Sequence, residues 1–257
     1  MALHGKVVLI TGAGGGLGQQ LARTYLDAGA SIIISDVNEA RLASARREFA
    51  APHPDKVLVV EADVADEPSV SRLVAAAVRE FSRLDVVVNN AAVMDRFEPA
   101  TACSKATWDA VLAVNLTGPF LVTKHAVAQM ERQQPPGGLV VNVGSNASFK
   151  GLSGGVAYVA SKHGLVGLTR NTASSYGDRG IYAVALLLGY MEETNIRDAF
   201  AGGLHDGGLG RMHQTQPDMR PVPTDHVARY ALFLSDKDTA RSANGSCIVI
   251  NGNWPEA

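Results

Sequence analysis

The sequence predicts an α/β fold, with one doubly wound domain over residues 1–257 whose mostly parallel sheet carries helices on both faces. Three observations predict it. Short β-branched apolar runs alternate with helical stretches along the chain. The first of these runs breaks into a glycine-rich turn that opens directly into a helix. No linker divides the 257 residues, and 46% of them are hydrophobic, which is enough for a large core.

The amino-terminal part has the pattern of a dinucleotide-binding βαβ unit. A strand over residues 6–11 breaks into the glycine run 12–18, and a helix over 19–28 follows. The glycines allow a tight turn close to a pyrophosphate, whose charge is bound by the amides at the start of the helix. Asp36 ends the next strand, 20 residues after Gly16, where a carboxylate can bind the ribose hydroxyls of NAD and repel the extra phosphate of NADP. The pattern predicts a Rossmann-type unit that binds NAD.

The rest of the chain repeats the alternation of strand and helix. Repetition in one polarity indicates a parallel sheet that is covered on both faces. We expect further strands at 31–35, 56–62, 84–88, 140–145, 181–188 and 247–250, and helices at 39–50, 68–81, 156–176 and 224–234, the last of them capped by Thr224, with two more helical segments flanking Asn115.

One stretch, residues 190–222, departs from this alternation. It is rich in glycine and proline but also carries Leu204, Leu209, Met212 and Met219. Such a composition is typical of a flexible surface loop, or of a lid whose glycine hinges carry apolar side chains over a substrate. Because the stretch follows a strand that ends at the ligand-binding edge of the sheet, we expect a substrate lid.

Charge and cysteine content exclude several classes of protein. The formal net charge is −2 and long charge runs are absent, which argues against nucleic acid or an anionic membrane as a partner. Cys103 and Cys247 lie far apart, and the seven histidines lack ligand spacing, so we expect neither a disulfide nor a metal site. The sequence opens without a secretory signal, and no apolar run approaches the length of a membrane span. We therefore expect a cytoplasmic protein.

A candidate catalytic pair lies in the helix predicted at 156–176. Tyr158 and Lys162 are four residues apart, so their side chains share one helical face. Because a nearby cation favours the phenolate, Lys162 is expected to lower the pKa of Tyr158 until the phenol can exchange a proton with an alcohol or ketone. Ser145 ends a predicted strand and would bring a hydroxyl to the ligand-binding edge. Each residue taken singly is more often structural, and only their combination favours catalysis.

Together these motifs resemble the short-chain dehydrogenase/reductase superfamily along nearly the whole chain. Residues 11–18 are similar to the family's Thr-Gly-x-x-x-Gly-x-Gly cofactor motif. Asp63-Val64 is similar to its adenine-contacting pair. Asn89–Ala92 resembles its Asn-Asn-Ala-Gly strand end, with Ala92 in place of the glycine. The resemblance implies the same doubly wound fold and a nicotinamide dinucleotide as cofactor.

The resemblance extends to the family's catalytic tetrad, which Asn115, Ser145, Tyr158 and Lys162 match in order, with the same 13-residue step from serine to tyrosine. It implies that Ser145 binds the substrate oxygen and that Tyr158 exchanges its proton. Lys162 would hold the nicotinamide ribose, and Asn115 would anchor a water that relays the proton outward. The resemblance also implies a homotetramer.

Two parts of the chain depart from the family pattern. Val184 and Leu188 stand where the family has asparagine and proline, although Gly189 and Thr194 of the same motif are present. The missing proline predicts a less rigid turn at the nicotinamide end. Residues 251–254 are a modified version of the family's Asp-Gly-Gly, a region that supports tetramer packing.

The sequence thus predicts an NAD-dependent oxidoreductase that interconverts a secondary alcohol and a ketone. Two alternatives are an NADP-dependent carbonyl reductase and a non-catalytic dinucleotide-binding regulatory or scaffold protein. The residues expected to bind the cofactor are Gly12, Gly16, Leu17, Gly18, Asp36, Asp63, Val64, Asn90, Ala91, Tyr158, Lys162, Gly189 and Thr194. Those expected to contact a mostly apolar or cyclic small-molecule substrate are Ser145, Asn146, Phe149, Tyr190 and Met191.

Overall fold

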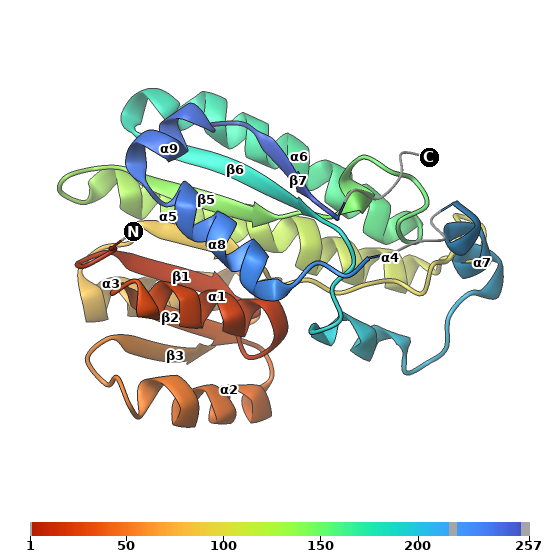
Figure 1. The fold of residues 1–257 in the computed structure, drawn as a ribbon, viewed down its shortest axis with the longest axis horizontal. Coiled ribbons are helices and arrows are strands. Elements are labelled where there is room, and N and C mark those ends of the chain that lie inside the picture. Colours follow the sequence, from red (N-terminus) through yellow and green to blue (C-terminus); the bar gives the residue numbers. More distant parts are fainter. Residues whose placement is uncertain (1, 216–219, 253–257) are drawn as a thin grey trace.

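The computed structural model describes residues 2–215 and 220–252 (Figure 1). Its centre is a seven-stranded sheet in the order β3-β2-β1-β4-β5-β6-β7, and every neighbouring pair of strands is parallel. The strands are β1 (Val7–Thr11), β2 (Ser31–Asp36), β3 (Val57–Glu61), β4 (Val86–Asn89), β5 (Gly138–Val143), β6 (Ile181–Leu188) and β7 (Cys247–Ile250). The predicted doubly wound fold is confirmed, and the strand order reverses between β1 and β4, where such sheets bind ligands.

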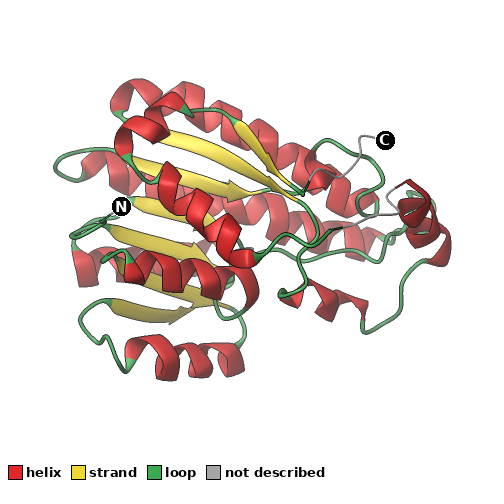
Figure 2. Ribbon diagram, in the orientation of Figure 1, coloured by secondary structure: helices red, strands yellow, loops and turns green. Residues whose placement is uncertain are grey.

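Helices cover both faces of this sheet (Figure 2). They are α1 (Gly16–Asp27), α2 (Glu39–Ala45), α3 (Glu67–Phe81), α4 (Lys105–Leu112), α5 (Gly118–Arg132), α6 (Val156–Tyr176), α7 (Asp206–Thr215), α8 (Thr224–Leu234) and α9 (Lys237–Ser242). Val8 and Ile10 of β1 belong to the core cluster that includes buried residues of α1 and α8, whereas Val7 and Leu9 belong to the cluster that includes α3 and α5. The alternation of side chains along each strand therefore builds two cores, one on each face.

Several helix boundaries differ from those expected. The helix predicted at 39–50 ends at Ala45 and continues as a π-helical segment, Arg46–Ala50. The two helical segments around Asn115 are joined by a second π-helical segment, Ala113–Thr117. Short π-helical insertions of this kind are common at functional sites.

The expected cap of α8 is also wrong. The capping residue is Pro223, and Thr224 is already helical, with its Oγ1 donating to Glu193 Oε2 at 2.9 Å. Helix α9 was not expected at all. It begins at Lys237 and is capped by Asp236, whose side chain accepts from the Thr239 amide at 3.0 Å.

One helical stretch, Lys105–Arg132, is long and apolar enough to cross a membrane by length and composition. Charged and polar residues interrupt it, so the sequence did not predict a span there. Half of its most apolar window is buried inside the fold, where α5 packs on α3 and on strands β4 and β5. It is thus built into the helix layer that covers one face of the sheet.

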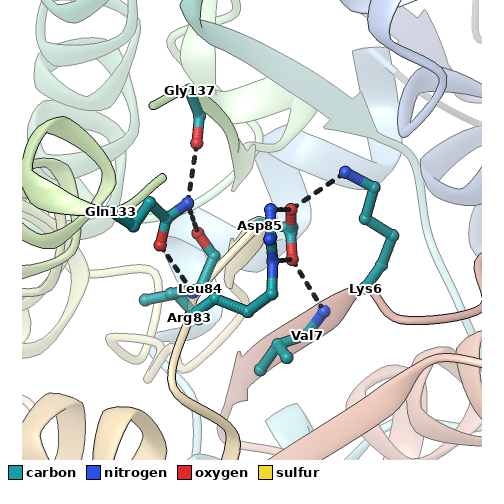
Figure 3. Close-up of polar contacts among 7 residues, drawn as sticks. All are labelled: Lys6, Val7, Arg83, Leu84, Asp85, Gln133 and Gly137. Atoms are coloured by element: carbon teal, nitrogen blue, oxygen red, sulfur yellow. Dashed lines mark hydrogen bonds and ion pairs between the residues drawn. The ribbon is translucent and has the colours of Figure 1, made fainter. Parts of the chain in front are cut away.

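The amino-terminal edge of the sheet is held by a polar cluster around Asp85, just before β4 (Figure 3). The Asp85 carboxylate accepts from Lys6 Nζ at 3.0 Å, from the Val7 amide at 3.0 Å and from two nitrogens of Arg83 at 2.7 Å. Burial acts to raise the pKa of Asp85, but the hydrogen bonds from Arg83, Lys6 and Val7 outweigh it and hold the pKa below its usual value. These contacts tie β1 to β4 at the edge opposite the ligand-binding one.

Candidate active site

A cavity of about 690 Å³ lies along the carboxyl edge of the sheet. Its walls come from the glycine turn, the ends of β2 to β6 and the segment after β6. Most of the residues expected to bind the cofactor line it, namely Gly12, Gly16, Leu17, Asp36, Asp63, Val64, Asn90, Ala91, Tyr158, Lys162, Gly189 and Thr194. The fold therefore brings to one place residues that are as much as 182 positions apart, from Gly12 to Thr194.

The glycine turn requires glycine at particular positions. Gly12 and Gly16 have φ values of +61° and +54°, which side chains rarely adopt. A Cβ at Gly12 would also lie 2.7 Å from the Cα of Ala91. Gly18 does not line the cavity. A Cβ there would lie 2.5 Å from the Gly12 carbonyl oxygen, so its place in this turn is close packing of α1 on β1. The backbone thus leaves a cradle that suits a pyrophosphate at the start of α1.

Asp36 is fixed at the cofactor end of the cavity. It is 6% exposed, and its carboxylate accepts from the Gly14 amide and from the Asn38 amide, both at 3.0 Å. The geometry suits the ribose contact expected of it, because a carboxylate has further lone pairs available.

Arg41, which sequence reasoning missed, lines the same end of the cavity. Its guanidinium pairs with the carboxylate of Asp198, on the 3₁₀ segment Asn195–Phe200 that follows β6. Its position in the first turn of the helix that follows Asp36 could have indicated that it lies near the cofactor. The partner, 157 positions away, could not be read from the sequence.

The end of β4 is tied to the glycine turn by Asn90 and Thr11. The Asn90 side-chain amide donates to the carbonyls of Thr11 at 2.9 Å and Gly12 at 3.0 Å. Thr11 Oγ1 in turn accepts from the amides of Asn90 and Ala91, each at 3.1 Å. This reciprocal set fixes the floor of the cavity at the point where the strand order reverses.

Tyr158 and Lys162 lie together on α6, with exposed fractions of 5% and 3%. Lys162 Nζ lies 5.7 Å from the centroid of the Tyr158 ring and donates to the Val143 carbonyl at 2.8 Å. Ser145, just beyond β5, hydrogen-bonds to Tyr158, and its Oγ also accepts from the Ala147 amide at 3.2 Å. Three of the four expected catalytic residues therefore meet at the wall of the cavity.

The protein's own groups do not lower the pKa of Tyr158 as expected. Burial raises it to about 12, which outweighs the lowering by the Ser145 hydrogen bond, and the Asp95 carboxylate raises it further. Burial also lowers the pKa of Lys162 to about 8. The expectation was wrong because it considered the charge of Lys162 without the desolvation of the pair.

Asn115 is completely buried and does not line the cavity. Its Oδ1 accepts from the Val93 amide at 2.8 Å, and its Nδ2 donates to the Val93 carbonyl at 2.8 Å and to Ser161 Oγ at 3.2 Å. The side-chain amide thus joins the loop after β4 to α6. Both hydrogens of its amide group are already used, so an anchored water would have to be held by the main-chain carbonyl, and the relay role stays a prediction.

The substrate side of the cavity is largely apolar. Ser145, Asn146, Tyr190 and Met191 line it as expected, but Phe149 does not. Phe149 follows the short 3₁₀ turn Asn146–Ser148 and is 42% exposed, with Lys150 Nζ 5.8 Å from its ring centroid. The sequence placed it near Ser145 but could not give the direction of the turn. The apolar lining also includes Met94, Phe97, Ile196, Phe200, Leu204, Leu209 and Met212.

The departures after β6 have a structural counterpart. Leu188 remains in the strand and pairs with Ile250 of β7, and the Gly189 amide donates to the Ile250 carbonyl at 3.0 Å. Strand pairing therefore holds the turn for which the family uses a proline. Thr194 lines the cavity next to the glycine turn, where its Cα would lie 3.1 Å from a Cβ at Gly16.

The predicted lid is partly helical. Gly207, Gly208 and Gly210 lie inside α7 and do not act as hinges in a loop, whereas Gly203 turns the chain with φ +86°. Met219 of the predicted lid, and Asn253 and Trp254 of the tail, lie outside the described residues. The lid function itself stays a prediction.

The fold and the cavity define an oxidoreductase that binds a nicotinamide dinucleotide, and comparison with known proteins agrees. The family model described as short chain dehydrogenase matches residues 6–202, and the chain belongs to this family. A short chain dehydrogenase/reductase, dpchG of Colletotrichum higginsianum, is 40% identical over 98% of this chain and 94% of its own length. The 3beta-hydroxysteroid dehydrogenase 2 of Eggerthella lenta is 35% identical over 98% of this chain and 95% of its own.

Solved structures with the same fold contain either form of the cofactor. A 3-ketoacyl-(acyl-carrier-protein) reductase from Brucella melitensis, in complex with NADH, has a TM-score of 0.85 at 26% identity, with 98% of both chains covered. A protein from Beutenbergia cavernae described as an NAD(P)-dependent gluconate 5-dehydrogenase, with NADP bound at low occupancy, has a TM-score of 0.83 at 30% identity and the same coverage. Family membership therefore leaves the choice between the two cofactors open.

Proposed function

We propose that this protein is an NAD-dependent dehydrogenase that interconverts a secondary alcohol and a ketone. The observation that carries the proposal is the meeting of Tyr158, Lys162 and Ser145 at one wall of the cavity whose far end holds the glycine turn and Asp36. The nicotinamide ring would accept or return the hydride. The protein's part is to hold the alcohol, to move its hydroxyl proton and to exclude water.

Ser145 and Tyr158 would share the substrate oxygen. In the direction of oxidation, Tyr158 takes the hydroxyl proton as general base, and in reduction it returns a proton to the carbonyl oxygen. Ser145 donates to the substrate oxygen and orients it. Lys162, whose Nζ lies 5.7 Å from the centroid of the Tyr158 ring, would bind the nicotinamide ribose. Because burial outweighs its charge at Tyr158, the phenolate would also need the positive charge of an oxidised nicotinamide ring.

Asp36 supports NAD as the cofactor. Its carboxylate is held in place by two backbone amides at the adenosine end of the cavity, where it can accept from ribose hydroxyls and repel a phosphate. Arg41 favours a second candidate, an NADP-dependent carbonyl reductase, because a guanidinium at this end could pair with that phosphate. Its ion pair with Asp198 favours NAD.

The apolar lining supports a mostly apolar or cyclic alcohol as the substrate. Phe97, Phe200 and Met212 approach from the loop after β4 and from the segment after β6, and none of them carries a group that would bind a charged substrate. The 3beta-hydroxysteroid dehydrogenase relative agrees with this substrate class. We also infer a cytoplasmic homotetramer, because both cysteines are free and Tyr230 and Phe233 are exposed.

Tyr158→Phe tests the proposal. The wild-type protein and the variant are compared with NAD and then NADP against a panel of secondary alcohols, and formation of reduced nicotinamide is followed by absorbance. We expect NAD-dependent turnover in the wild type and a loss of at least about a thousandfold in the variant, because the general base is removed while the binding groups remain. Cofactor affinity should be unchanged. Turnover retained by Tyr158→Phe would refute the assignment, and an inactive wild type that still binds NAD would favour a non-catalytic scaffold.

A further inference from the structure

Asp95, in the segment between β4 and α4, is a buried carboxylate that does not line the cavity. It is 1% exposed, and its oxygens accept from three backbone amides. These are Phe97 N at 3.2 Å, Gly155 N at 2.8 Å and Tyr158 N at 2.9 Å. A buried charge is tolerated only where such partners replace water, so the position of Asp95 is closely determined.

Two of those amides, at the capping residue Gly155 and at Tyr158 in the first turn, lie at the start of α6. Its capping residue is Gly155, which has no side chain to offer, and Asp95 supplies the missing cap from another part of the chain. The Glu98 carbonyl accepts from the Val156 amide at 2.9 Å, so the same short segment binds the next amide as well. The start of α6 is therefore fixed by residues 95–98.

The segment is itself held in an unusual conformation. Phe97 has a φ of +64°, which costs free energy for a bulky residue. The hydrogen bond from its backbone amide to the Asp95 carboxylate offsets part of that cost. The His205 amide donates to the Arg96 carbonyl at 2.8 Å, so the predicted lid rests on the same segment. A strained backbone conformation persists only where surrounding contacts hold it in place. The segment around Phe97 has such contacts on two sides, because it binds both the predicted lid and the start of α6.

We propose that Asp95 is a positioning residue for the reaction, whose carboxylate binds the amide of Tyr158 and thereby sets the place of the phenol. The inference rests on the proposed role of Tyr158 as general base. Asp95 touches the backbone of Tyr158 and acts on the reacting atoms only through that residue.

The direction of the charge effect follows from the neighbours. Lys162 is the cation next to Tyr158, and Asp95 is the anion that raises the pKa of its phenol. Arg96 and Glu98 form an ion pair in the same segment as Asp95, and the pKa of nearby Cys103 is raised by burial and by both carboxylates. Removal of the Asp95 charge should therefore lower the pKa of Tyr158 and move the acidic limb of alcohol oxidation to lower pH.

Asp95→Asn tests this in the full-length protein. An asparagine keeps one acceptor but turns an NH₂ group toward an amide donor, so the contact is broken while the size is kept. We expect kcat to fall on the order of ten- to a hundredfold from misplacement of the phenol. The acidic limb of kcat should move to lower pH, with NAD affinity unchanged by fluorescence titration. Asp236→Asn removes the charge of an equivalent helix cap at α9, remote from the cavity, and should change neither the limb nor kcat.

Gly155→Ala provides a second variant in case Asp95→Asn fails to fold. A Cβ at Gly155 would lie 2.6 Å from the Asp95 carboxylate, and the backbone there (φ −81°) accepts alanine. The carboxylate must move off α6 with its charge retained. We expect kcat to fall with NAD affinity unchanged.

Three results would overturn the proposal. The first is an Asp95→Asn variant that keeps the wild-type kcat and the wild-type acidic limb of the pH profile. The second is an Asp95→Asn variant whose acidic limb is unmoved and whose kcat falls only in step with its NAD affinity and its melting temperature. The third is an unchanged kcat in Gly155→Ala. These results differ from a failure of the proposed function. In that case the Tyr158→Phe variant would stay active in the same assay.

Discussion

Two opposite charges, Asp36 and Arg41, stand at the adenosine end of the cavity, and the balance between them would decide which cofactor binds. Asp36 is buried and held by two amides, whereas Arg41 is partly exposed and paired with Asp198. Substitution of Asp36 by alanine should leave Arg41 as the dominant charge toward a ribose phosphate. The ratio of kcat/KM for NADP to that for NAD should rise at least about tenfold, because a like-charge contact costs several kcal/mol. Steady-state kinetics with both cofactors measures it.

Asp36→Asn separates the charge from the contacts of this residue. Asparagine can still accept from the Gly14 amide but carries no charge. If repulsion decides the preference, the two variants should shift it similarly. An unchanged preference in both would show that Asp36 has no part in the choice of cofactor.

The Tyr158 and Lys162 pair shows how far single residues can be interpreted from the sequence. Their spacing predicted a shared helix face correctly, since helical periodicity is local. The pKa of Tyr158 was not predictable, because it depends on burial and on Asp95, 63 positions away. The same limit applies to Arg41 and Asp198. Residue types and their order along the chain are present in the sequence, but long-range partners and desolvation are not.

At the scale of the element, some strands and helices were predicted to the residue, whereas β5 lies two residues earlier than the strand expected at 140–145, and α1 begins three residues before the helix expected at 19–28. The bounds of β6, β7 and α6 agree with the expectation. Helix α7 was missed because Gly207, Gly208 and Gly210 lower its helical propensity, and packing against the loop after β4 compensates. The π-helical segment at Asn115 was also missed, since nothing local distinguishes it from regular helix.

Gly208 and Gly210 of α7 test whether this helix is a lid. A Cβ at Gly208 would lie 1.9 Å from the Phe97 carbonyl oxygen, which is backbone and cannot move aside easily. Gly208→Ala should push α7 away from residues 95–98 and open the substrate end of the cavity. We expect KM for the alcohol to rise on the order of tenfold, with the affinity for NAD unchanged. Initial-rate kinetics and a separate cofactor titration check both.

Gly210→Ala is the matched control in the same helix. Nothing lies within 4 Å of a Cβ at Gly210, so alanine should add only helical propensity, about 1 kcal/mol. KM should stay at the wild-type value, and the melting temperature should not fall. If Gly208→Ala also kept the wild-type KM, α7 would not close over the substrate.

At the scale of the whole molecule, the two edges of the sheet have different tasks. The amino-terminal edge is closed by the Asp85 cluster and by Gln133, which binds the Leu84 backbone and the Gly137 carbonyl (Figure 3). The carboxyl edge is left open as the cavity. Stabilising contacts and the reacting groups are therefore separated by the length of the strands, so loops at the cavity can vary while the sheet remains fixed.

The remaining surface carries exposed aromatic side chains on both helix layers, which supports the proposed tetramer. Phe233 on α8 is 58% exposed and borders a shallow pocket with Tyr230, and Phe120 on α5 is 49% exposed. A tetramer with closed symmetry needs at least two different self-complementary contacts, and these two patches lie on opposite layers of the fold.

Phe233→Glu should place four charges in one type of contact and split the tetramer into dimers, as measured by light scattering after gel filtration. Arg79→Glu, a charge change on the exposed side of α3, should leave the mass unchanged. A monomeric wild type, or a Phe233→Glu variant of wild-type mass, would contradict this arrangement, because an unpartnered phenylalanine has no contact to lose.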